Sequence, residues 1–168
     1  MKYLTFLFFI VLFFNACSLK QVDKPKTQSK VEKLTLMISN SSSNININEA
    51  KIVSEKLISH SLLLSKNYKV NTSALIHNTL INLDFKKRGL CYHYARDLIK
   101  FINPKEYKSF EIKKIVANRG EYFEHTALLL TRNDISFQDS IVLDAWRNTG
   151  DLYFSKIVND KRYEWELK

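Results

Sequence analysis

Three residues whose side chains can act as nucleophile, base and acid follow one another in the second half of this chain: Cys91, His125 and Asp144. Cys91 begins a segment of helical periodicity, whereas His125 and Asp144 lie in runs that are typical of strands. In a cysteine triad the imidazole takes the thiol proton and the acid orients the imidazole. The order of the three residues, and the elements expected to carry them, favour such a triad.

A thiol has an ordinary pKa of about 8.5, so it is a weak nucleophile at neutral pH until its proton is removed. The amino end of a helix would place a positive partial charge beside Cys91. His125, from a facing strand, would take the proton and leave a thiolate–imidazolium pair. Asp144, on the neighbouring strand, would hold the ring and select its tautomer.

Each of these residues also has a purely structural interpretation. Cys91 on an apolar helix face can be a small core residue, His125 a hydrogen-bonded core histidine, and Asp144 a partner of Arg147 or a turn cap. Zinc bound by Cys91, His93 and His125 is a further alternative. Because positions i and i+2 of a helix diverge, however, we expect His93 to face the edge of the site or solvent.

The neighbours of the three residues are expected to wall a cleft or pack beside it, rather than to react. These neighbours are Tyr92, Glu124, Trp146 and Arg147. His60 and His77 lie in amphipathic helical segments and carry no motif. We expect no cofactor and no metal.

Helices are predicted on both sides of residue 70. Asn48 is a candidate N-cap for a helix whose apolar positions recur at helical spacing (Ile52, Val53, Leu57, Ile58 and Leu62), and a weaker helical segment covers 73–83. A third helix begins at Cys91, with Gly89 giving the chain room to turn in, and Pro104 ends it.

Strands are predicted after Pro104 at 110–118, 123–131, 140–146 and 152–158, with a hairpin turn at 118–121. In the second strand Phe123, His125, Ala127 and Leu129 share one face. A helix packed on an antiparallel sheet is an α+β architecture.

The set Gly89-Leu90-Cys91, Glu124-His125-Thr126-Ala127 and Leu143-Asp144-Ala145-Trp146-Arg147 resembles the core of the transglutaminase-like branch of papain-fold cysteine enzymes. The resemblance covers 87–158. It implies a papain-like fold with Cys91 as nucleophile, His125 as general base and acid, and Asp144 as the orienting acid. The upstream Gln or Trp that such enzymes often use in the oxyanion hole has no identifiable counterpart, although the Cys91 N–H can supply one donor.

The N-terminal segment of the chain is typical of an exported protein. Lys2 precedes an apolar run, residues 4–14, that is too short to span a bilayer but suits a signal peptide over 1–16. Its end, Ala16-Cys17-Ser18, resembles a bacterial lipobox, which implies a lipid on Cys17. Phe14 and Asn15 depart from the usual pattern, and an ordinary signal peptide remains the alternative. Ser18 would favour the outer membrane over the inner one.

Composition and charge limit the classes of binding partner that we expect. The polar, lysine-rich segment 17–34 is expected to be a flexible tether, and 35–168 to form one folded domain. The formal charge of +9 suits anionic lipid or cell-wall polymer, although scattered lysines also simply solvate a surface. Nucleic acid is not an expected partner of an exported protein.

Two classes of function remain open. One is a lipid-anchored envelope enzyme, a peptidase, amidase or acyltransferase, that acts on peptide or peptidoglycan-type amides through an acyl-thioester. The other is an inactive module of the same fold that holds a peptide or a partner.

Overall fold

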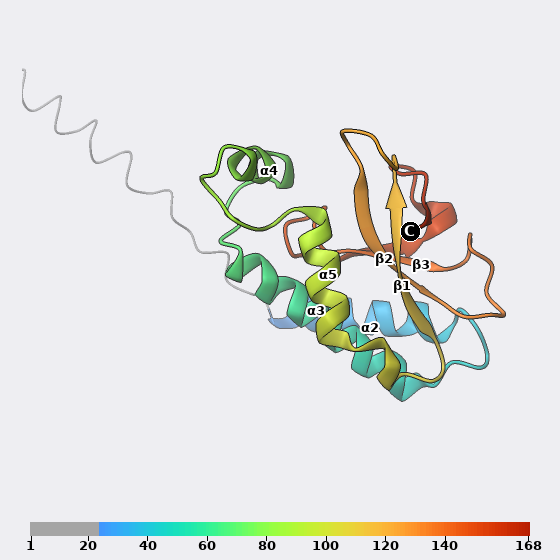
Figure 1. Ribbon diagram of the computed structural model, residues 1–168. Coiled ribbons are helices and arrows are strands. Elements are labelled where there is room, and N and C mark those ends of the chain that lie inside the picture. The colour runs from blue at the N-terminus through green and yellow to red at the C-terminus, as the bar shows by residue number, and fades with distance from the viewer. Residues whose placement is uncertain (1–23) are drawn as a thin grey trace, which may run out of the picture.

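The computed structural model describes residues 24–168, so the predicted signal peptide and Cys17 lie outside the described residues. The predicted α+β class is confirmed: helices cover one side of a five-stranded antiparallel sheet of order β4-β3-β2-β1-β5 (Figure 1). The helices are α2 (Lys24–Ser39), α3 (Ile47–Asn67), α4 (Ala74–Asn82) and α5 (Cys91–Ile102). The strands are β1 (Glu111–Ala117), β2 (His125–Thr131), β3 (Ile141–Asp144), β4 (Tyr153–Lys156) and β5 (Glu166–Leu167), and short 3-10 turns occupy Pro104–Glu106 and Ile157–Asn159.

Helix α2 corrects the prediction of a tether over 17–34. Its residues Val31, Leu34 and Ile38 are buried at i, i+3 and i+7, where they join the core shared with α3. Val31, Leu34 and Ile38 fall on one face of this lysine-rich helix, and that face is enough to dock the helix. The folded part therefore begins at least as early as residue 24, not at 35.

The helix predicted after Asn48 is confirmed as α3, but its N-cap is Asn46. The Oδ1 atom of Asn46 accepts the backbone N–H groups of Asn48 and Glu49 at 2.9 and 3.2 Å. Asn46, an extended residue two positions before the predicted cap, thus satisfies two free donors of the first turn. Ile52, which we expected on the apolar stripe, is exposed.

The predicted strands are confirmed, each with shorter bounds. β1 and β2 form a hairpin whose register runs from Glu111 opposite Thr131 to Ala117 opposite His125. β2 therefore begins at His125, beside the hairpin loop, and β3 ends at Asp144. β5, a two-residue strand that pairs with β1, was not predicted.

Apolar side chains fill both sides of the sheet. Leu128, Leu130 and Leu143 pack toward the helices. Ala127 and Leu129, on the opposite face of β2, pack with Trp165 from the C-terminal segment. Both faces of β2 are therefore buried over most of its length.

Among residues 24–168 no helix combines the length and the apolar character needed to cross a membrane.

Candidate active site

Cys91 is the first residue of α5, and a histidine fixes the start of that helix. Leu90 is the extended N-cap residue. The Nδ1 atom of His93 accepts the backbone N–H groups of Gly89 and Leu90, each at 3.2 Å. His93 is buried, so the expectation that it faces the site edge or solvent is wrong. It turns back to satisfy the donors that a helix start leaves free.

A second histidine supports the segment that leads into Cys91. His77 of α4 is fully buried, and its Nε2 lies 2.9 Å from the carbonyl oxygen of Arg88, to which it donates. Gly89 has a φ of +126°, and a Cβ atom there would lie 2.5 Å from His77 Nε2. The close approach therefore requires glycine, in agreement with its predicted role in the turn.

The structure brings His125 and Asp144 into direct contact. His125 Nε2 lies 2.7 Å from Asp144 Oδ2, and both side chains are almost wholly buried. Because a carboxylate can only accept, the Nε2–H donates to Asp144. The Nδ1 atom remains as the ring nitrogen that can exchange a proton with a thiol.

The thiol of Cys91 lies next to this ring. Its Sγ donates to the carbonyl oxygen of Glu124 at 3.9 Å, one residue before His125. The side chain of Cys91 is also one of the groups whose interaction raises the pKa of His125. All three residues of the predicted triad therefore meet where α5 begins, β2 begins and β3 ends.

The protonation of the two buried groups follows from their contacts. Burial alone would lower the pKa of His125, but hydrogen bonds to Asp144 and Cys91 and the charges of both outweigh burial, raising the pKa to about 9. Burial would raise the pKa of Asp144, but the hydrogen bond and charge of His125, with the charge of Arg147, hold it below its ordinary value. This geometry favours an imidazolium facing a carboxylate at neutral pH.

Asp144 is held by four donors. Its Oδ1 accepts the backbone N–H groups of Trp146 and Arg147 at 3.0 and 3.1 Å. Its Oδ2 accepts the Arg147 Nε–H at 3.1 Å as well as the bond from His125. The predicted alternative, that Asp144 pairs with Arg147, thus coexists with the contact to His125.

Beneath the triad Arg147 joins two buried carboxylates. Its two terminal nitrogens donate to Asp160 at 3.0 and 2.6 Å, and Asp160 also accepts the Trp165 Nε1–H at 2.9 Å. Arg147 therefore packs under the site and does not wall a cleft. Sequence reasoning did not single out Asp160, because no local pattern links it to Arg147.

Aromatic rings enclose His125. The ring centroids of Trp146, Tyr163 and Trp165 lie 4.9, 4.6 and 5.4 Å from the centroid of the imidazole. Trp146 donates its Nε1–H to Asn78 of α4 at 3.0 Å, so α4 is tied to the site. Trp146 packs beside the triad as expected. Tyr163 and Trp165 were missed, because they follow the last predicted strand and belong to no motif.

Tyr92 and Glu124, the other expected cleft neighbours, are exposed at the surface. Tyr92 follows Cys91 and leaves 46% of its surface open to solvent. The carboxylate of Glu124 accepts the Gly120 N–H at 3.0 Å and pairs with Lys168 at 3.2 Å. These contacts tie Gly120 of the hairpin loop and Lys168 to Glu124, whose backbone carbonyl oxygen accepts from the thiol.

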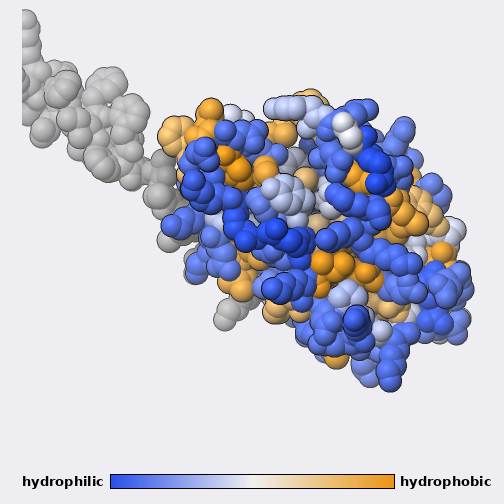
Figure 2. Space-filling model, viewed as in Figure 1, coloured by the Kyte–Doolittle hydropathy of each residue, from blue (hydrophilic) through white to orange (hydrophobic). Residues whose placement is uncertain are grey.

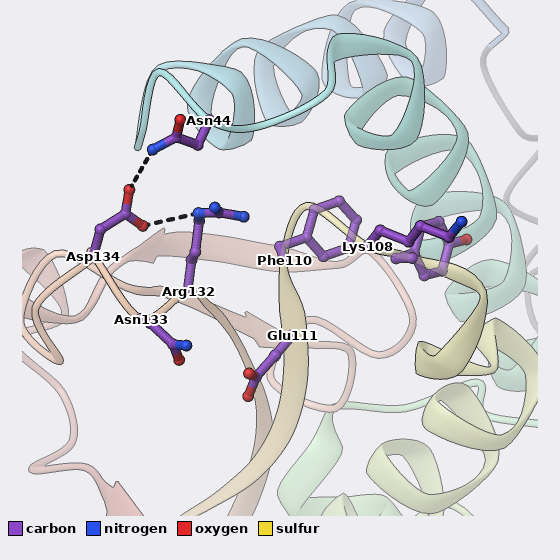
Figure 3. Close-up of a pocket in the computed structure, with 8 residues that line it drawn as sticks. Asn44, Lys108, Phe110, Glu111, Arg132, Asn133 and Asp134 are labelled. Atoms are coloured by element: carbon purple, nitrogen blue, oxygen red, sulfur yellow. Dashed lines mark hydrogen bonds and ion pairs between the residues drawn. The ribbon is translucent and has the colours of Figure 1, made fainter.

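The hollow bordered by Cys91, Thr126 and Trp146 is small. It has an empty volume of about 180 Å³ and no room for a water molecule. A larger cavity of about 530 Å³, lined by Asn44, Arg132 and Asp134 among others, lies at the far end of the β1–β2 hairpin (Figure 3). Six residues of strand, or about 20 Å, separate that end from His125, so the larger cavity is not part of the triad site.

In the part of the chain from 24 to 168, no three histidine, cysteine or acidic side chains are grouped to hold a metal ion. Because His93 Nδ1 is engaged by two backbone N–H groups, the arrangement does not support the zinc alternative with Cys91 and His125. His60 stacks on Phe101 with ring centroids 3.6 Å apart.

No protein-family model matches this sequence, and comparisons with curated proteins and with solved structures found no match. The class of protein therefore has to be argued from the geometry of the site.

Proposed function

We propose that this chain is a thiol enzyme with a transglutaminase-like, papain-type core that cleaves or transfers amide bonds. The observation that carries the proposal is the contact between His125 Nε2 and Asp144 Oδ2, with Cys91 beside the same ring at the start of a helix. Nucleophile, base and orienting acid lie in the order that the chemistry needs.

In the proposed reaction the Cys91 thiolate attacks an amide carbonyl. The imidazolium of His125 gives its proton to the leaving amine, and a thioester on Cys91 results. Water, or a second amine, then attacks the thioester while His125 takes its proton, and the thiol is released. Water gives hydrolysis, and an amine gives transfer.

The start of α5 supplies donors for the oxyanion of this reaction. The N–H groups of Cys91 and Tyr92 belong to the first turn, where a helix offers no carbonyl acceptor. The N–H groups before and after these two already have acceptors: the Leu90 N–H donates to His93 Nδ1, and the His93 N–H donates to the Leu90 carbonyl oxygen. Two adjacent donors near the thiol support stabilisation of a negative oxygen.

We propose further that the enzyme is exported and anchored in the cell envelope by a lipid on Cys17, with the outer membrane favoured. The support is the short apolar run and the Ala16-Cys17-Ser18 sequence. Envelope proteins and peptidoglycan-type peptides are then the accessible amides.

The reactivity of the thiol tests the proposal. In the full-length chain with Cys17→Ser, Cys91 is the sole thiol, and its alkylation by iodoacetamide is followed at pH 7. An ordinary thiol is only about 3% ionised at that pH, so loss of the ion pair in His125→Ala should slow alkylation by up to about thirtyfold. His60→Ala, a histidine remote in the sequence and stacked on Phe101, should leave the rate unchanged. Equal alkylation rates in the Cys17→Ser parent and in both histidine variants would contradict the proposal.

A binding module is the second candidate, and the exposed ring of Tyr92 next to Cys91 favours it, because an exposed aromatic side chain suits contact with a peptide or a partner. In that case Cys91→Ala would retain the envelope function of the protein, because no covalent step is lost. For the enzyme the same substitution abolishes it.

A further inference from the structure

Helix α4 has an apolar side that nothing in the described chain covers. Leu75 and Ile76 are exposed by 56% and 55%, and Leu83 and Phe85, just beyond the helix, by 60% and 74%. At 100° per residue, positions 75, 76 and 83 fall within an arc of about 100°. Figure 2 shows this apolar surface over α4, at the upper left.

The opposite side of α4 fixes the helix to the body of the protein. Ala74 and His77 are buried, and Asn78 accepts the hydrogen bond from Trp146. The exposed apolar residues are thus held outward by contacts on the other face, and the helix cannot turn to bury them.

Basic side chains border the apolar side. Lys86 and Lys87 follow Phe85, and the Nζ of Lys86 donates to the carbonyl oxygen of Lys69 at 3.2 Å, which brings a third lysine to the same end. The one acid among them is Asp84, which lies 3.7 Å from Lys87, and both side chains are largely exposed. The border of the apolar side is therefore positively charged.

We propose that α4 and the segment to Lys87 form a docking surface for an anionic phospholipid bilayer. Apolar side chains on a short helix with lysines beside them match the interface between acyl chains and anionic headgroups. Two copies of this chain are a poorer fit for each other, because a symmetric contact would bring the same three lysines together. The surface is distinct from the triad and from any lipid on Cys17.

Fluorescence from a tryptophan in the full-length chain tests this surface. Phe85→Trp is compared with Leu36→Trp, an exposed apolar position on α2. Both proteins carry the same N-terminal segment and the same two native tryptophans. The probe is a vesicle of phosphatidylcholine and phosphatidylglycerol with brominated acyl chains, which quench tryptophan only within the bilayer.

We expect stronger quenching at position 85 than at position 36. The difference should disappear in pure phosphatidylcholine and in the Lys86→Glu, Lys87→Glu double variant of Phe85→Trp. Equal quenching at the two positions overturns the proposal. So does a blue shift of the Phe85→Trp emission without vesicles that grows with protein concentration, since a second copy would then cover the surface.

Discussion

The two nitrogens of the His125 ring have different partners, and this difference decides what the residue can do. Nε2 is committed to Asp144, which is itself held by Arg147 and two backbone donors. Nδ1 is left to serve the thiol. A ring held in one orientation loses little entropy when it moves a proton.

Nuclear magnetic resonance should show that the His125 imidazolium keeps its proton at pH values well above the ordinary histidine pKa of about 6.5. With a pKa raised to about 9, the ring is still mostly charged at pH 8, where a solvated histidine is neutral. Asp144→Asn and Cys91→Ala should each lower this pKa, because each removes an acceptor and a negative charge. A wild-type titration near pH 6.5, unmoved by either substitution, would contradict the ion pair.

Sequence reasoning named the three central residues, Arg147 as a possible partner of Asp144 and Gly89 as the turn before Cys91, but not the other residues that hold the site. Cys91, His125 and Asp144 stand at recognisable ends of a helix and two strands, so their order carried information. His93 was placed wrongly, because helical periodicity describes mid-helix directions, whereas a side chain at the third position can turn back to cap. Asp160 meets Arg147 only through the tertiary fold, and Trp165 in turn donates to Asp160.

At the level of elements, the start of α5 depends on how closely α4 approaches it. His77 takes up the space that a side chain at position 89 would need. The glycine, the buried imidazole and the Arg88 carbonyl together set where the first turn of α5 lies, and with it the thiol.

Gly89→Ala should therefore lower the free energy of unfolding by at least about 2 kcal/mol and slow the alkylation of Cys91. Gly120→Ala is the matched control. Its φ of +77° also strains an alanine, but no atom lies within 4 Å of the added Cβ, so about 1 kcal/mol is expected. Urea denaturation measures both, and equal losses would mean that the contact with His77 is unimportant.

Strands were predictable where apolar residues alternate or form a continuous run in the sequence. The two elements that were missed, β5 and α2, lack such a signal for physical reasons. β2 has a long apolar run bounded by turn residues, which is a strong signal. β5 has only two residues, both exposed, so its pairing with β1 leaves no trace in the sequence. α2 is mostly lysine and polar residues, and its three buried apolar residues are too sparse a signal to predict a helix.

In the whole molecule, the C-terminal segment closes the side of the sheet away from the helices. Trp165 packs against Ala127 and Leu129, and Asp160 receives the guanidinium of Arg147. The last residues of the chain are therefore part of the site, although they follow Asp144 by a whole strand.

Asp160→Asn should destabilise the fold by about 3–5 kcal/mol, because it removes one of the two carboxylates that neutralise a buried guanidinium. Asp151→Asn, which breaks a surface ion pair with Lys30, should cost less than about 1 kcal/mol. Thermal unfolding of the two variants measures the difference. Similar losses would show that Arg147 does not depend on its second partner.

Two histidines, His93 in the first turn of α5 and His125 at the start of β2, make the fold sensitive to pH in opposite directions. Burial, with the charges of Arg88 and Arg96, lowers the pKa of His93, so its stabilising contribution is lost as pH falls below the ordinary value of 6.5. His125 contributes fully below pH 6.5 and loses its contribution as pH rises through about 9. Acid protonates His93, whose Nδ1 must accept two N–H groups. Alkali deprotonates His125, whose imidazolium faces the Asp144 carboxylate. Together they confine the greatest stability of this end of the molecule to neutral pH.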